Sequence, residues 1–141
     1  MLTKTHVTLE EIKKTLSASP KLIARLNEFA KVVVVSRGGF GAISVLSQFL
    51  KTRWYDTACI SSYSEEKSQG EFNVHKLDPT DEEVLIVEDM VDTGNTVKFL
   101  KEKFPNAKVF SLHYKPAKSV VKPDFYLWET DDWIVYPWEL D

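Results

Sequence analysis

The chain contains a single cysteine, Cys59, among its 141 residues. No disulfide can therefore form within the chain, and we expect a protein of a reducing compartment, the cytoplasm. No apolar run approaches the roughly 20 residues needed to cross a bilayer, and the N-terminus lacks a secretory pattern. The sequence accordingly predicts neither a membrane span nor export.

Neither sign of charge dominates the composition. The chain has 18 basic and 21 acidic residues, which give a formal net charge of -3. A nucleic-acid binder needs a concentrated basic face, so this balance argues against that class while leaving room for a local basic pocket. Hydrophobic residues make up 43% of the chain, enough to bury a core. The length fits one domain, residues 1–141.

Apolar runs alternate with amphipathic segments along the chain. We expect helices over residues 9–17, 20–30, 41–50 and 95–104, and strands over 32–35, 54–62, 84–87, 109–114 and 124–127. Residues 64–73 are expected to form a polar loop, and the segment from 130 onward to be irregular. Strands that alternate with helices predict a parallel, doubly wound α/β sheet. In such sheets ligands bind beyond the carboxyl ends of the strands.

The most informative stretch begins with the apolar strand 84–87. Two acids, Glu88 and Asp89, follow it directly, and a turn of small polar residues leads into the next helix. That turn consists of Asp92, Thr93, Gly94, Asn95 and Thr96. Its amides can converge on an anion at the positive end of the helix dipole. The carboxylates suit Mg²⁺ or sugar hydroxyls. The stretch therefore predicts a site for a phosphate beside a hydroxylated group.

A second buried strand ends in the motif Ser36-Arg37-Gly38-Gly39. Adjacent glycines remove side chains where something must approach the backbone closely. Arg37 adds a fork of hydrogen-bond donors that suits a polyanion. Alone, this motif fits a structural turn better than a binding site.

Together, the two motifs resemble the pyrophosphate loop and the phosphoribosyl pyrophosphate signature of type I phosphoribosyltransferases. With Lys115-Pro116-Ala117, Asp132-Trp133-Ile134 and Pro137-Trp138, the pattern is similar to bacterial xanthine-guanine and hypoxanthine-guanine phosphoribosyltransferases. The resemblance implies the type I parallel sheet with a small irregular C-terminal hood that binds the base. It also implies a Mg²⁺-dependent enzyme of purine salvage that works as a homodimer or homotetramer. The substrates would be phosphoribosyl pyrophosphate and a free 6-oxopurine.

The resemblance also implies roles for residues of the donor site. The pyrophosphate contacts would come from Arg37, Gly38 and Gly39, with a cis peptide bond between Ser36 and Arg37. Glu88 and Asp89 would hold the ribose hydroxyls or Mg²⁺. The remaining phosphoribosyl contacts would come from Asp92, Thr93, Gly94, Asn95 and Thr96.

On the purine side, the resemblance implies that Lys115 recognises the 6-oxo group, and that Trp133 and Ile134 shape the base pocket. An oxopurine also needs an acceptor for the proton that leaves its ring nitrogen. Asp92 is the candidate for this catalytic role. The loop of residues 64–73 could close over the site and exclude water.

Three features depart from the family pattern. Glu88 stands where the bacterial proteins often have aspartate. The polar loop usually presents an arginine to pyrophosphate, whereas Gln69 occupies about that place here, with Lys67 or Lys76 as candidate substitutes. The chain stops at Asp141, so we expect contacts that longer relatives make with their tails to be missing.

Two alternative functions are open at this point. One is a transferase with the same donor and another base, adenine or a pyrimidine, as acceptor. Lys115 disfavours adenine, whose 6-amino group is itself a donor. The other is a regulatory protein that keeps the fold to sense a nucleotide and binds RNA or a protein. The acidic balance and the intact Asp92 disfavour it.

Overall fold

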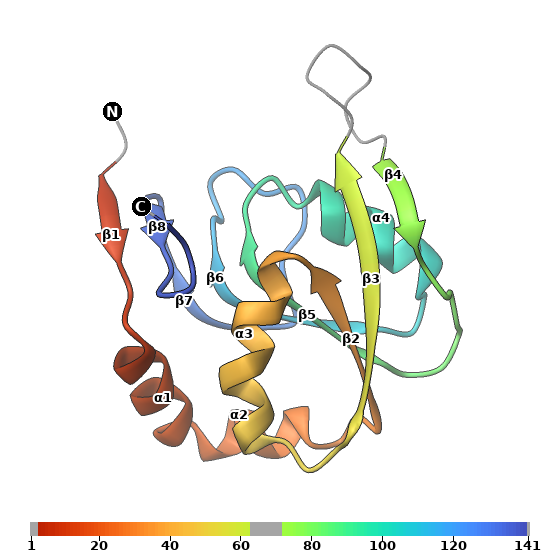
Figure 1. The fold of residues 1–141 in the computed structure, drawn as a ribbon, viewed down its shortest axis with the longest axis horizontal. Coiled ribbons are helices and arrows are strands. Elements are labelled where there is room, and N and C mark those ends of the chain that lie inside the picture. The colour runs from red at the N-terminus through yellow and green to blue at the C-terminus, as the bar shows by residue number, and fades with distance from the viewer. Residues whose placement is uncertain (1–2, 63–71, 141) are drawn as a thin grey trace.

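The computed structural model describes residues 3–62 and 72–140. Its main sheet contains β2 (Lys31–Ser36), β3 (Trp54–Ser62), β4 (Phe72–Lys76), β5 (Leu85–Val91), β6 (Lys108–Tyr114) and β7 (Phe125–Glu129). The strand order is β4-β3-β2-β5-β6-β7 (Figure 1). Every neighbouring pair is parallel except β3 and β4, which pair antiparallel at one edge. The predicted parallel α/β sheet is confirmed.

Helices cover both faces of this sheet, as the doubly wound prediction requires. The helices are α1 (Leu9–Ser17), α2 (Pro20–Leu26), α3 (Gly38–Leu46), the 3₁₀ helix η1 (Ser47–Phe49) and α4 (Asn95–Lys103). On one face, Leu46 of α3 packs in a buried cluster with strand residues such as Val87. On the other face, Leu100 of α4 is buried with Ile86 and Val109. The strands between the two layers are therefore apolar on both sides.

The first helix begins as the sequence predicts. Thr8 is its N-cap: the amide of Glu11 donates to Thr8 Oγ1 at 3.1 Å, and the amide of Thr8 donates to Glu11 Oε1 at 3.2 Å. This reciprocal capping box satisfies two amides that the helix leaves free. Ile12 and Leu16 form its buried face.

The next two helices differ from their predicted bounds. Helix α2 ends at Leu26 rather than at residue 30, because the Asn27 side chain bonds to the backbone. Its amide nitrogen donates to the carbonyls of Ile23 and Phe49, and its oxygen accepts from the amide of Lys51. Helix α3 begins at Gly38 rather than at residue 41, so both glycines of the motif lie in its first turn.

The strand that carries the acids is also longer than predicted. Glu88 and Asp89 lie within β5, which continues to Val91, because β6 supplies register partners beyond residue 87. Strand β4 includes residues 72 and 73, which were expected in a loop. Neighbouring strands override the weak strand preference of polar residues such as Glu88, Asp89 and Asn73.

A second, two-stranded sheet joins the two ends of the described chain. Strand β1 (Lys4–His6) pairs parallel with β8 (Trp133–Val135) (Figure 1). The prediction that everything after residue 130 is irregular is therefore wrong for these three residues. Within residues 3–62 and 72–140, no helix combines the length and apolar character needed to cross a membrane.

Candidate functional site

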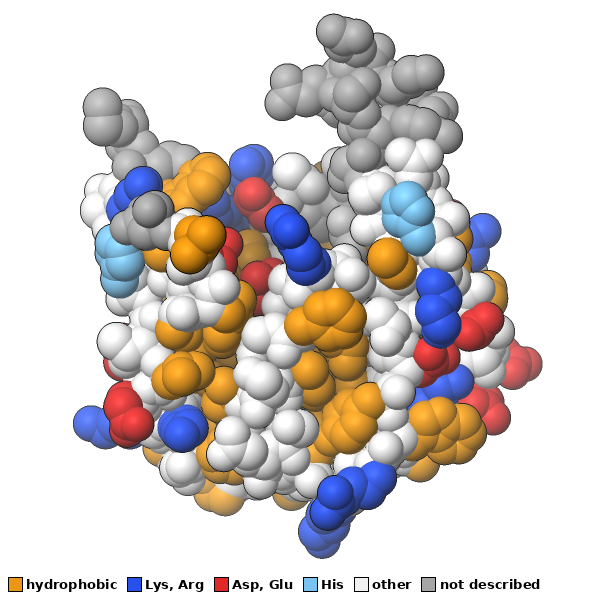
Figure 2. All heavy atoms as spheres, viewed as in Figure 1, with side chains coloured by type: hydrophobic (Ala, Val, Ile, Leu, Met, Phe, Trp, Pro, Cys, Tyr) orange, Lys and Arg blue, Asp and Glu red, His pale blue; other side chains and the backbone are white. Residues whose placement is uncertain are grey.

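The predicted site residues gather at the carboxyl ends of β2, β5 and β6. Arg37 follows β2, Glu88 and Asp89 lie near the end of β5, and Lys115 follows β6. Because these strands are parallel neighbours, one edge of the sheet collects all of them. Figure 2 shows acidic and basic side chains close together in the hollow at the top of its view. Asp89 lines one cavity at this edge and Glu88 lines another.

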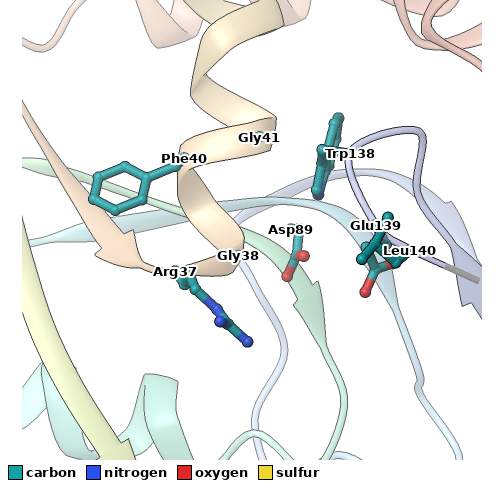
Figure 3. A pocket seen from close by; sticks show the side chains of 8 residues that line it. All are labelled: Arg37, Gly38, Phe40, Gly41, Asp89, Trp138, Glu139 and Leu140. Carbon is teal, nitrogen blue, oxygen red and sulfur yellow. The ribbon is translucent and has the colours of Figure 1, made fainter.

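The larger cavity has a volume of about 680 Å³. Its lining residues are Arg37, Gly38, Phe40, Gly41, Asp89, Trp138, Glu139 and Leu140. Figure 3 shows the side chains of Arg37, Asp89 and Glu139 directed into the same space, with Trp138 facing the backbone of α3. The cavity therefore lies between the start of α3, the end of β5 and residues 138–140 of the C-terminal segment.

The two glycines of the motif lie against strand β5, whereas the sequence predicted only that something approaches their backbone closely. A β-carbon added at Gly38 would lie 2.6 Å from Asp89 Oδ1, and one at Gly39 would lie 2.6 Å from the carbonyl oxygen of Val87. The absent side chains thus let α3 pack directly against β5 at the acid, rather than only opening space for a ligand. The peptide bond between Ser36 and Arg37 is cis, which confirms the prediction.

The smaller cavity has a volume of about 80 Å³ and lies along the turn before α4. It is lined by Glu88, Met90, Val91, Asp92, Thr93, Gly94, Thr96 and Val97. Gly94 has a φ of 82°, a left-handed conformation that favours glycine, and forms the N-cap of α4. The turn therefore places a helix start beside a carboxylate.

Most of the amides predicted to bind an anion are available in this turn. Among the described residues, the amides of Thr93, Gly94 and Thr96 donate no hydrogen bond, whereas the Asn95 amide donates to Thr93 Oγ1 at 3.3 Å. Unpaired amides at a helix start attract anions. The 80 Å³ cavity consequently has donors on the turn and a carboxylate, Glu88, on β5.

The pKa values of the two adjacent acids on β5 are both raised. Burial raises the pKa of Glu88 well above its ordinary value, and the charge of Asp89 raises it further. Burial also raises the pKa of Asp89, and the charge of Glu139 adds to the rise. Both groups therefore favour a compensating positive charge nearby.

Asp92 contacts two lysines that follow β6. Its Oδ1 atom lies 3.1 Å from Lys118 Nζ and 3.8 Å from Lys115 Nζ. Oδ1 is buried and accepts no hydrogen bond within the described residues, so the contacts are ionic rather than directional. Lys115 is only 6% exposed. Lys118 was not predicted, and its only signal is its position three residues after Lys115.

The other two purine candidates lie apart from both cavities. Trp133 is 56% exposed on β8, and Ile134 is buried in the core cluster that also contains Val7 and Tyr136. Neither residue lines the cavities described above. The structure thus brings Lys115 to Asp92, which lines the smaller cavity, whereas Lys115, Trp133 and Ile134 themselves line neither cavity.

Three residues of the C-terminal segment enter the site region without having been predicted to do so. Glu139 lines the larger cavity with Trp138, whose indole ring occupies the space that a side chain at Gly41 would need. Tyr136 stacks on Trp138, with ring centroids 5.0 Å apart and planes 5° apart. The sequence offered two signals: the aromatic character of the segment, and the Pro137-Trp138 pair that contributed to the family resemblance.

The candidate substitutes for the loop arginine have mixed outcomes. Gln69 and Lys67 lie outside the described residues, as does most of the expected loop. Lys76 Nζ lies 2.6 Å from Asp56 Oδ1 and 3.1 Å from Asp78 Oδ2. It is engaged in these ion pairs at the edge of the sheet and lines neither cavity.

Comparison with known proteins identifies the class. Residues 8–141 match the phosphoribosyl transferase domain, and the chain belongs to this family. A xanthine-guanine phosphoribosyltransferase of Idiomarina loihiensis is 31% identical over 138 residues, which cover 95% of this chain and 86% of that protein.

Two solved structures share the fold over nearly the whole chain. A purine phosphoribosyltransferase from Pyrococcus horikoshii has a TM-score of 0.79 and 28% identity, and a Helicobacter pylori xanthine-guanine-hypoxanthine phosphoribosyltransferase has a TM-score of 0.75 and 25% identity. Each match covers 98% of this chain and 95% of the other. The family and fold predicted from the sequence are confirmed.

Proposed function

We propose that this protein transfers the phosphoribosyl group from phosphoribosyl pyrophosphate to a 6-oxopurine: guanine, xanthine or hypoxanthine. The products are the nucleoside 5′-monophosphate and pyrophosphate, which makes the reaction a step of purine salvage. One observation carries the proposal: the buried Lys115 lies beside Asp92, at the turn whose amides are available for a phosphate. The names of the related proteins agree with this substrate class.

The donor would bind across the end of β5. The amides of Thr93, Gly94 and Thr96 would hold its 5′-phosphate, because they are free and lie at a helix start. Arg37, in the larger cavity, would bind the pyrophosphate. The ribose would then face Asp89, which lines the larger cavity, and Glu88, which lines the smaller one.

Glu88 and Asp89 would also hold Mg²⁺. The described residues contain no cluster of three or more possible metal ligands. A pair of carboxylates nevertheless fits Mg²⁺, which commonly takes one or two from the protein and the rest of its ligands from substrate phosphates and water. The raised pKa values of both acids agree with a site that a cation would relieve. Bound Mg²⁺ would neutralise charge on the departing pyrophosphate.

The protein's own residues would then divide the remaining work. Breaking the bond between C1′ and the pyrophosphate oxygen builds negative charge on the leaving group, which Arg37 stabilises. As the purine nitrogen bonds to C1′, Asp92 accepts the proton that leaves the ring. The ammonium group of Lys115 donates to the 6-oxo group and so selects against adenine, which presents a donor there.

The assembly and location of the protein are part of the same proposal. The single cysteine suits the reducing cytoplasm. We propose a homodimer or homotetramer, which light scattering with size-exclusion chromatography would distinguish from a monomer.

The function is tested by supplying phosphoribosyl pyrophosphate, Mg²⁺ and single free bases, and by identifying the nucleotide formed. We expect monophosphates from guanine, xanthine or hypoxanthine, no product from adenine or pyrimidines, and no product after chelation of Mg²⁺. Product only from adenine or a pyrimidine would contradict the proposed acceptor. Nucleotide binding without any transfer would favour the regulatory alternative.

A further inference from the structure

Asp89 lies where β5 extends beyond its pairing with β2 and is paired on one side only, with β6. The register pairs between β2 and β5 end at Val87, and the ladder between β5 and β6 passes from Glu88 to Met90 without a partner for Asp89. The carboxylate of Asp89 also faces the like charge of Glu139. The Asp89 amide donates to Glu88 Oε1 at 3.2 Å, so the Asp89 carbonyl is the group that takes its partner from outside these ladders.

The hydroxyl of Tyr136 makes that contact. It donates to the carbonyl oxygen of Asp89 at 2.9 Å, although the two residues belong to distant parts of the chain. Tyr136 is only 3% exposed, so its side chain is largely shielded from water. The Asp89 carbonyl is partly buried, so losing this donor would remove one of the contacts that fix its peptide.

A second buried residue orients the hydroxyl. His113 Nδ1 lies 2.9 Å from Tyr136 Oη. The single hydroxyl proton is used toward Asp89, so Oη accepts, and the neutral imidazole must carry its proton on Nδ1. His113 is 4% exposed and packs against Trp128, with ring centroids 4.8 Å apart. The chain of donors runs from β6 through the C-terminal segment to β5.

The C-terminal segment is itself held in place. The amide of Tyr136 donates to Glu139 Oε1 at 2.8 Å. The Tyr136 ring stacks on Trp138, which packs against Gly41 in α3. The hydroxyl is thus presented to Asp89 by a rigid support rather than by a free side chain.

We propose that Tyr136 and His113 are positioning residues for Asp89: their hydrogen-bonded chain fixes the Asp89 peptide so that its carboxylate faces the phosphoribosyl donor. The inference rests on the proposed function and deepens it. Neither residue touches the reacting atoms. Their effect should fall on the donor, whose ribose Asp89 would hold, more than on the purine, which Lys115 would recognise.

The test is Tyr136→Phe, which keeps the aromatic stack and removes only the hydroxyl. We expect kcat/KM for phosphoribosyl pyrophosphate to fall about fivefold to tenfold, while KM for the purine changes less than about twofold. The matched control is Tyr126→Phe, which removes a hydroxyl bonded to Glu129 at an exposed site. It should match the parent in both constants.

His113→Phe gives an independent measurement. It should also lower kcat/KM for phosphoribosyl pyrophosphate. The double variant should lower this constant no further than Tyr136→Phe alone, because the two side chains act as one unit. If Tyr136→Phe does not fold, as judged by thermal unfolding, His113→Phe carries the test by itself. If the two residues had a merely structural role, the variants would change the thermal stability but would not affect kcat/KM for phosphoribosyl pyrophosphate more than KM for the purine.

Two failures are distinguishable. If the parent transfers phosphoribosyl to a purine and the folded variants keep its donor constant, the positioning role is overturned and the proposed function stands. If the parent neither binds the donor in calorimetry nor transfers it to any purine, the proposed function fails and this inference fails with it.

Discussion

Asp92 Oδ1 lies 3.8 Å from Lys115 Nζ, where the ends of β5 and β6 meet. The acid is the candidate proton acceptor, and the buried lysine is the candidate donor to the purine 6-oxo group. Their closeness means that both can address the same side of one planar base. Lys118, 3.1 Å from the same oxygen, adds a second cation at the rim.

Asp92→Asn tests the proton role. The amide keeps the shape of the side chain but cannot accept the proton as a carboxylate does. We expect kcat for purine transfer to fall about 10²- to 10⁴-fold, with the dissociation constant for phosphoribosyl pyrophosphate near that of the parent. Asp78→Asn, which alters an exposed ion pair with Lys76, is the control for loss of one acid. Transfer at the parental rate would rule out Asp92 as the proton acceptor.

Lys115→Ala tests recognition of the base. A hydrogen bond from a charged group is worth about 1.5–3 kcal/mol, so KM for the purine should rise about 10- to 100-fold. KM for phosphoribosyl pyrophosphate should change much less. Lys108→Ala removes an exposed lysine at the start of β6, the strand that Lys115 follows, and should leave both constants unchanged. Equal losses for both substrates would indicate a folding defect instead.

Gly94→Ala tests the turn. Its left-handed φ of 82° disfavours a side chain by about 1–2 kcal/mol, and the new β-carbon would also collide with Ser119 Oγ. The variant should unfold at a lower urea concentration and bind a nucleoside monophosphate more weakly. Gly94→Asn adds the same β-carbon but tolerates this backbone better. Equal stability of the two variants would mean that the collision, and not the conformation, dominates.

The buried His113 makes stability depend on pH. Burial lowers the pKa of His113 from 6.5 to about 4. Between these values the unfolded chain takes up a proton that the folded protein does not. The contribution of the neutral His113 to the free energy of unfolding is therefore fully present above pH 6.5 and is lost as the pH falls toward 4. The loss is about 3 kcal/mol. The difference in unfolding free energy between the parent and His113→Phe, measured in urea, should shrink by this amount. A difference independent of pH would contradict the assignment.

Local signals were sufficient for much of the fold. Four consecutive valines predict β2, a capping box predicts the start of α1, and the acids followed by a Thr-Gly turn predict the phosphate site. Each of these patterns lies within a few adjacent residues. The structure places the ends of β2 and β5, with the acids and the turn, at one edge of the sheet, as parallel topology requires.

Other features depend on residues far apart in sequence. Strands β1 and β8 are only three residues long each and are stabilised by one another. Glu88 and Asp89 are polar, yet β5 continues through them because β6 pairs with Glu88, Met90 and Val91. The contact between Tyr136 and Asp89 arises only when the C-terminal segment folds back over the sheet. None of these pairings leaves a periodic trace in the sequence.

The most direct measurement is a crystal structure with guanosine 5′-monophosphate bound. The account predicts that the phosphate oxygens accept from the amides of Thr93, Gly94 and Thr96, that the ribose hydroxyls face Glu88 and Asp89, and that the guanine 6-oxygen lies within hydrogen-bond reach of Lys115 Nζ. A nucleotide whose phosphate binds away from this turn, while those amides pair with the protein's own groups, would contradict it.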